Sequence, residues 1–161
     1  MKILLLQLLT IAYKRYKVSG IDSNSIEELF EIRELIETYV ARSLADRAKC
    51  GDKILHNETS LLVKEMDEGE HLFDKGDEEN AFRISIAFHK KLISLLNNRF
   101  ITKMILQLSD HLFRAQNLSS QVPPRIKRSF QEHKRILNGI LGGKGSEVEK
   151  YTIVNVLNKV T

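Results

Sequence analysis

The sequence predicts an all-α fold, an antiparallel bundle of about six helices. Apolar residues recur at intervals of three and four through most of the chain, the spacing that places them on one face of a helix. No segment longer than a few residues alternates with the two-residue period of a strand. Two prolines and eight glycines among 161 residues leave little room for the many turns of a β fold. This length favours one domain with a substantial core.

The first three helices are predicted over residues 25–49, 53–74 and 77–96. The first opens with a capping box, Ser25-Ile26-Glu27-Glu28, in which serine and glutamate side chains satisfy free backbone N–H groups. It ends at Gly51-Asp52, because both residues disfavour a helix interior.

The last three helices are predicted over residues 100–117, 124–141 and 146–159. Pro124 suits the first turn of a helix, where its missing N–H would have no intrahelical partner. A second capping box, Ser146-Glu147-Val148-Glu149, opens the last helix.

Charge and cysteine content exclude several classes of protein. The net charge is +4, but 25 basic residues are spread among 21 acidic ones, and no nucleic-acid motif follows the basic clusters Lys14–Lys17 and Arg125–Arg128. We interpret both clusters as solvated faces. Cys50 is the single cysteine, so no internal disulfide can form, which fits the cytoplasm. No run approaches the roughly 20 apolar residues of a membrane span, and residues 3–12 are interpreted as a docking helix.

Two histidines in separate predicted helices, His89 and His133, are the strongest functional signal. Ser85 lies one helical turn before His89, and Asn155 lies in the last predicted helix. Inward-facing side chains from three helices of a bundle meet in one cavity. Imidazole is a common metal ligand and also binds carboxylates, so the pattern predicts a small-molecule site.

Several short segments match one family in order and spacing. They are Leu29-Phe30-Glu31-Ile32-Arg33-Glu34-Leu35-Ile36-Glu37, Phe88-His89, Asn98, Glu132-His133 and Ile136-Leu137. Through them, residues 23–159 resemble the C-terminal ligand-sensing (FCD) domain of the FadR subgroup of GntR-type bacterial transcription regulators. The resemblance implies a domain that binds a small carboxylate effector, and it implies no enzyme activity.

The resemblance also implies a metal site of one aspartate and three histidines, from which this chain departs. His89 and His133 are retained, but Ser85 replaces the aspartate and Asn155 the last histidine. A hydroxyl and an amide are poor ligands for Zn²⁺ or Ni²⁺, so a divalent metal would be bound weakly, through His89 and His133.

Two interpretations of the polar residues remain open. In the first, Arg33 pairs with the effector carboxylate while Ser85, His89, His133 and Asn155 supply hydrogen bonds. In the second, the polar groups satisfy one another, with Arg33 paired to Glu37 or another acid.

We expect residues 23–161 to form the ligand-sensing domain. Residues 1–22 form an N-terminal extension, interpreted as the remnant of a lost winged helix-turn-helix, so this chain alone is not expected to bind DNA. It is expected to form a homodimer, or a heterodimer with an intact relative.

The alternative is a decayed interaction module or a metal-dependent hydrolase using His89 and His133. A hydrolase needs a carboxylate base, and Glu132 is expected to point elsewhere, about 100° around the helix from His133.

Overall fold

The computed structural model describes residues 23–105 and 123–157. Five helices have both ends within these ranges: α2 (Ser23–Lys49), α3 (Lys53–Asp74), α4 (Glu78–Ser94), α6 (Pro123–Leu141) and α7 (Gly145–Leu157). Residues 99–105 are also helical. No residue of the described ranges lies in a strand, which confirms the predicted all-α class.

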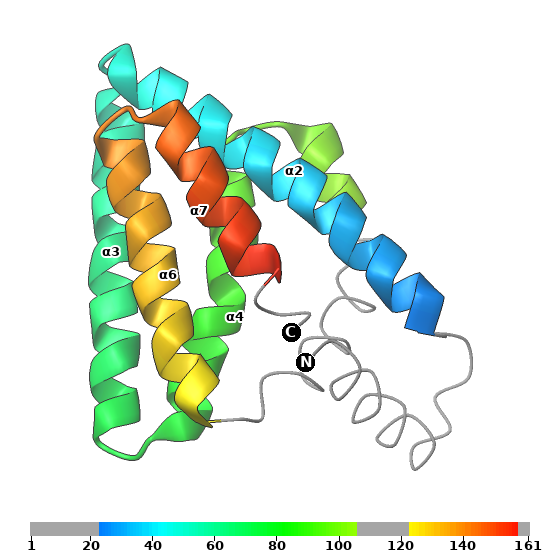
Figure 1. The fold of residues 1–161 in the computed structure, drawn as a ribbon. Coiled ribbons are helices and arrows are strands. Elements are labelled where there is room, and N and C mark those ends of the chain that lie inside the picture. The colour runs from blue at the N-terminus through cyan, green and yellow to red at the C-terminus, as the bar shows by residue number, and fades with distance from the viewer. Residues whose placement is uncertain (1–22, 106–122, 158–161) are drawn as a thin grey trace.

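The helices form a bundle in which α3, α4 and α6 run side by side (Figure 1). Helix α2 crosses the bundle obliquely, and α7 packs along it, between α2 and α6 (Figure 1). Polar side chains on α2, α4, α6 and α7 can therefore meet in the interior.

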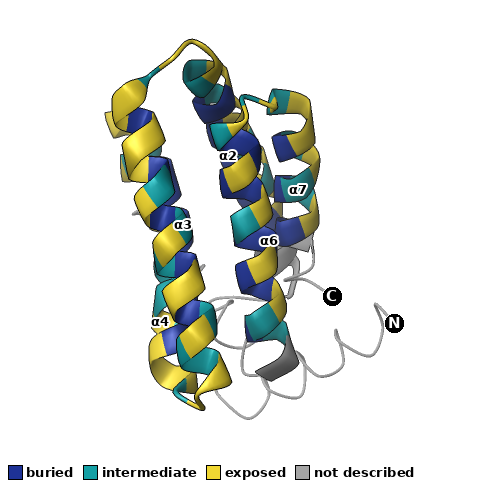
Figure 2. Ribbon diagram, turned by 90° about the vertical axis from the view of Figure 1, so that its left-hand side faces the viewer, coloured by how far each residue is buried: buried dark blue, intermediate teal, exposed yellow. Residues whose placement is uncertain are grey.

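Each helix has a buried side and an exposed side (Figure 2), and most of the buried residues are apolar. The core contains large side chains that are less than 2% exposed, including Leu44, Met66, Phe88, Phe130 and Ile136. Burial of each such side chain stabilises the fold by about 1.5–3 kcal/mol relative to exposure.

Two glycines set the closest approaches between helices. A Cβ added at Gly69 of α3 would overlap the ring of Phe130 on α6. A Cβ added at Gly139 of α6 would overlap the side chain of Val148 on α7. The absence of a side chain at these positions lets α6 pack tightly against both neighbours.

Helix α3 has the bounds that the sequence predicts, because one residue at each end stops the helix through its own local contacts or conformation. Asp52 accepts a hydrogen bond from the Leu55 N–H at 3.0 Å and caps the N-terminus. The guanidinium of Arg47 also binds this carboxylate, at 2.6 Å. These two contacts hold the pKa of Asp52 below its usual 3.8, the Leu55 N–H being the larger cause. At the other end Gly76, with φ of +86°, ends the helix.

Other predicted ends are wrong by one or two residues. Helix α2 begins at Ser23 and α7 at Gly145, so Ser25 and Ser146 lie inside the helices and not at the predicted N-cap positions. Glu149 instead accepts a hydrogen bond from Arg42 of α2, at 3.2 Å. Helix α4 ends at Ser94, two residues early, and Asn98 caps the following segment by accepting from the N–H groups of residues 100 and 101, both at 3.1 Å.

Some predictions lie outside the described residues: the N-terminal extension 1–22, the basic cluster Lys14–Lys17 and most of the helix over 100–117. The basic cluster at Arg125–Arg128 is only partly a solvated face, because Ile126 is buried and Arg125 half-buried. No described helix is long and apolar enough to cross a membrane.

Candidate functional site

Polar side chains from four helices gather inside the bundle, where apolar residues would ordinarily pack. Each is at most 9% exposed. They are Arg33 and Glu37 of α2, Ser85 and His89 of α4, Ser129, Glu132 and His133 of α6, and Thr152 and Asn155 of α7. Because a buried polar group without partners costs free energy, their mutual contacts decide what this interior can do.

Arg33 and Glu37 form a buried ion pair one turn apart on α2. The Arg33 Nε donates to Glu37 Oε1 at 2.6 Å, and both side chains are 2% exposed. Their four-residue spacing places them on the same face of the helix. Loss of either partner would leave an uncompensated buried charge, at a cost of about 3–5 kcal/mol.

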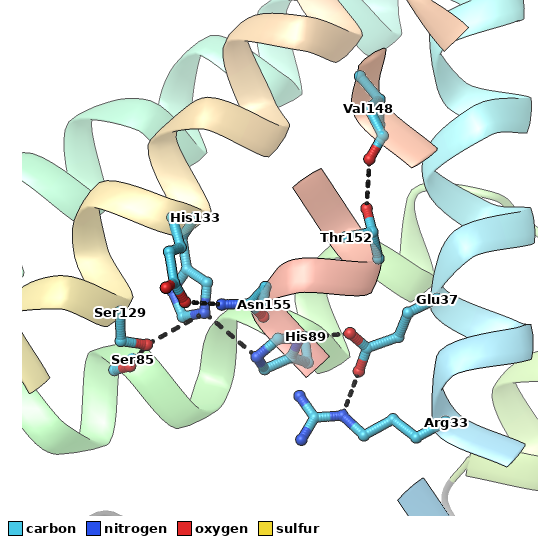
Figure 3. Close-up of polar contacts among 10 residues, drawn as sticks. Arg33, Glu37, Ser85, His89, Ser129, His133, Val148, Thr152 and Asn155 are labelled. Carbon is cyan, nitrogen blue, oxygen red and sulfur yellow. Dashed lines mark hydrogen bonds and ion pairs between the residues drawn. The ribbon is translucent and has the colours of Figure 1, made fainter. Parts of the chain in front are cut away.

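Glu37 also binds the first histidine. Its Oε2 lies 2.9 Å from His89 Nδ1, close enough to favour a proton on that nitrogen, although the two groups are not aligned as in a well-formed hydrogen bond. The carboxylate thus fixes the orientation of the ring and turns its other nitrogen, Nε2, toward α6 (Figure 3).

The two imidazoles meet at the centre of the site. His89 Nε2 lies 3.2 Å from His133 Nε2, and the rings are perpendicular with centroids 4.8 Å apart. Phe88 stacks on the face of His133 at 3.9 Å, which holds that ring in place.

Two serines continue the contacts from His133 back to α4. Ser129 Oγ lies 3.3 Å from His133 Nε2, and Ser85 Oγ lies 3.1 Å from Ser129 Oγ (Figure 3). Each serine is four residues before a histidine on its own helix. We call the six connected residues the histidine network: Arg33, Glu37, Ser85, His89, Ser129 and His133.

A second group of contacts, the Glu132 cluster, lies between α6 and α7. Asn155 Nδ2 donates to Glu132 Oε2 at 2.8 Å, and Arg128 Nε donates to Glu132 Oε1 at 3.0 Å. Glu132 was expected to point elsewhere, and it is only 8% exposed. Glu132 contacts Asn155 of α7, whereas His133 contacts His89 of α4, so these neighbouring positions of α6 are both buried.

All five residues predicted to bind the ligand are therefore buried in this interior. Arg33, Ser85, His89 and His133 belong to one network, and Asn155 belongs to the adjacent cluster. Of the two interpretations of Arg33, the structure shows its pairing with Glu37. Ser129 was not among the predicted site residues, although its spacing from His133 repeats that of Ser85 from His89.

The interior does not fit a resident Zn²⁺ or Ni²⁺. The separation of the two Nε2 atoms is close to the roughly 3.3 Å between neighbouring nitrogen ligands of a tetrahedral zinc. A third and fourth strong ligand are lacking, since residues 23–105 and 123–157 contain no group of three or more His, Cys, Asp or Glu side chains placed to bind a metal. Ser85 contacts Ser129, and the Asn155 amide contacts Glu132.

Comparisons with known proteins agree with this architecture. The model of the FCD domain family matches residues 28–153. Over 138 residues the chain is 23% identical to LutR, an HTH-type transcriptional regulator of Bacillus subtilis (strain 168). That match covers 83% of this chain but only 59% of LutR. The metal-free FCD domain of TM0439 has the same fold, with a TM-score of 0.64 and 21% identity over 88% of this chain and 93% of that domain.

Proposed function

The chain belongs to the FCD domain family, and from that premise we propose that it is the effector-binding and dimerisation domain of a cytoplasmic, GntR-type transcription regulator. The proposed effector is a small organic acid bound inside the bundle, next to the histidine network. His89, His133, Ser85 and Asn155 supply hydrogen bonds. Arg33 acts through Glu37, whose carboxylate orients His89.

One observation carries this proposal: a connected set of polar side chains from α2, α4 and α6 occupies the interior of a bundle. Replacing a whole buried ion pair by well-packed apolar residues is often neutral or stabilising, although removal of one partner alone is costly. Stability alone therefore does not explain why polar groups are kept in this interior. Their hydrogen-bonding groups suit a ligand that carries both charge and oxygen atoms.

An enzyme is the weaker alternative, because both oxygens of each nearby carboxylate already contact other side chains. The two oxygens of Glu37 contact Arg33 and His89, and those of Glu132 contact Arg128 and Asn155. A general base must be able to accept a proton from water or substrate, and these contacts oppose that role. We therefore propose a binding function for His89 and His133.

Thermal unfolding with a panel of C2–C4 acids and their primary amides tests the proposal. At a concentration 100 times its Kd, a bound acid should raise Tm by about 5–10 °C, and the matched amide should not. His89→Gln should abolish the rise, whereas Lys90→Gln, at the exposed neighbouring position, should retain it. A panel in which no acid raises Tm would support the decayed interaction module instead.

The proposed assembly is a homodimer or a heterodimer with an intact relative, with DNA contacts made outside the domain described here. Sedimentation velocity tests this part separately. It should give a species of twice the 18.5 kDa chain mass, and a concentration-independent monomer would contradict it.

A further inference from the structure

Two arginines of α6, Arg125 and Arg128, interact with the carboxylate of Glu132. Both oxygens of its carboxylate are occupied, one by Arg128 Nε and the other by Asn155 Nδ2. Arg125 lies two helical turns before Glu132 and interacts with its charge. Two guanidinium groups, those of Arg125 and Arg128, thus interact with one carboxylate.

Two buried polar atoms beside Glu132 have no hydrogen-bond partner among the described residues. One is Nη2 of Arg125, and the other is Oδ1 of Asn155. Asn155 is fully buried, and its Nδ2 is used by Glu132, so the amide cannot rotate to satisfy its oxygen without losing that bond. Burial lowers the pKa of the half-buried Arg125, in keeping with a guanidinium that has lost part of its hydration.

The two atoms are chemically complementary, a cationic donor and a neutral acceptor, on two residues that both interact with Glu132. A donor or acceptor left unpaired in a protein interior costs about 1–3 kcal/mol, which a ligand supplying both bonds would recover. A carboxylate suits the guanidinium, and a hydroxyl hydrogen suits the amide oxygen. An ammonium group would suit Asn155 equally, but it would add a third positive charge beside Arg125 and Arg128.

We propose that Arg125 and Asn155 determine effector specificity: Arg125 Nη2 binds the carboxylate, and Asn155 Oδ1 accepts a hydrogen bond from a hydroxyl group of the same small acid. This inference rests on the proposed function and deepens it. It assigns the carboxylate to Arg125 instead of Arg33, whose Nε already donates to Glu37 at 2.6 Å.

Isothermal titration calorimetry with three matched probes tests the inference: lactate, propionate and alanine. Propionate lacks the hydroxyl of lactate, and alanine replaces it with an ammonium. The wild type should bind lactate about 10-fold or more tighter than either, since one well-made hydrogen bond is worth about that factor. Glycolate against acetate repeats the comparison at a smaller size.

Variants assign the two contacts separately. Asn155→Leu should bring the ratio of lactate to propionate affinity close to 1, and Arg125→Gln should weaken both acids by about 10-fold or more while keeping the ratio. Arg135→Gln removes an exposed guanidinium from the same helix and should change neither value. Circular dichroism checks that each variant is folded, and the wild-type ratio tests the hydroxyl contact without any variant.

Two failures can be told apart. If no acid of any kind binds the wild type, the proposed function is wrong and this inference falls with it. If acids bind with equal affinity whether or not they carry a hydroxyl, or if Arg125→Gln binds them normally, only the specificity assignment is overturned.

Discussion

His89 and His133 face each other through their Nε2 atoms, 3.2 Å apart, at the centre of the bundle. A hydrogen bond at this distance needs a proton on one nitrogen and a lone pair on the other. Because Nδ1 of His89 lies 2.9 Å from a Glu37 carboxylate oxygen, a neutral His89 carries its proton there and accepts at Nε2. His133 is then the donor.

This arrangement predicts two different tautomers in one protein. In ¹⁵N NMR spectra of the imidazoles at neutral pH, His89 should be the Nδ1–H tautomer and His133 the Nε2–H tautomer. The exposed His56 serves as a reference. Finding His89 protonated at Nε2 alone would contradict the proposed role of Glu37.

Glu37 is predicted to be essential for stability. Glu37→Gln keeps the shape of the side chain but leaves the charge of Arg33 buried without its counter-ion, so it should lower the free energy of unfolding by about 3–5 kcal/mol. Urea titration measures the change. Glu79→Gln breaks an exposed Arg–Glu pair of the same four-residue spacing and should cost at most about 0.5 kcal/mol. Equal losses in the two variants would show that burial of the Arg33–Glu37 pair is irrelevant.

The cap at Asp52 predicts a pH dependence of stability. Its folded-state pKa lies below the usual 3.8, so its charge stabilises the folded state at neutral pH, and this contribution is lost as the pH falls through the lowered pKa. Asp52→Ala should lower Tm by about 2–4 °C at pH 7, and the difference from wild type should shrink below about pH 4. Asp52→Asn, which keeps a capping oxygen without charge, should lie between them. A difference that is constant from pH 7 to pH 2 would rule out this charge effect.

Restoring the missing ligands should create a metal site. The wild type is predicted to bind Zn²⁺ or Ni²⁺ weakly, through His89 and His133, with substoichiometric metal after dialysis. Ser85→Asp combined with Asn155→His supplies a carboxylate and a third imidazole, so the double variant should bind one metal ion tightly by calorimetry. Ser85→Asp alone should gain less. Failure of the double variant would mean that positions 85 and 155 do not converge on the two histidines.

Sequence periodicity was sufficient for the fold and for most members of the site, but not for their pairing. The ends of α3 could be predicted because Asp52 and Gly76 act locally. The starts of α2 and α7 could not be predicted in the same way. Ser25 and Ser146 match a capping motif, but both lie after the first residue of their helix. Angles around a helix place Glu132 away from His133, but they do not reveal that α6 is buried on both of those sides.

The choice of partner for Arg33 also required the structure. Glu37 and an external carboxylate are both compatible with the sequence, and only the packing of α2 against α4 shows the carboxylate held between Arg33 and His89. From the sequence alone, Arg125 is interpreted as one member of a solvated basic cluster. The structure shows that it is half-buried and interacts with Glu132.

Native mass spectrometry of the purified protein tests the central claim most directly, because it detects subunit number, metal and bound small molecule together. We expect a dimer that retains a small organic acid, or takes one up from the acid panel, without stoichiometric metal. A species that stays empty at saturating concentrations of every acid would contradict the account and leave dimerisation as the remaining candidate function.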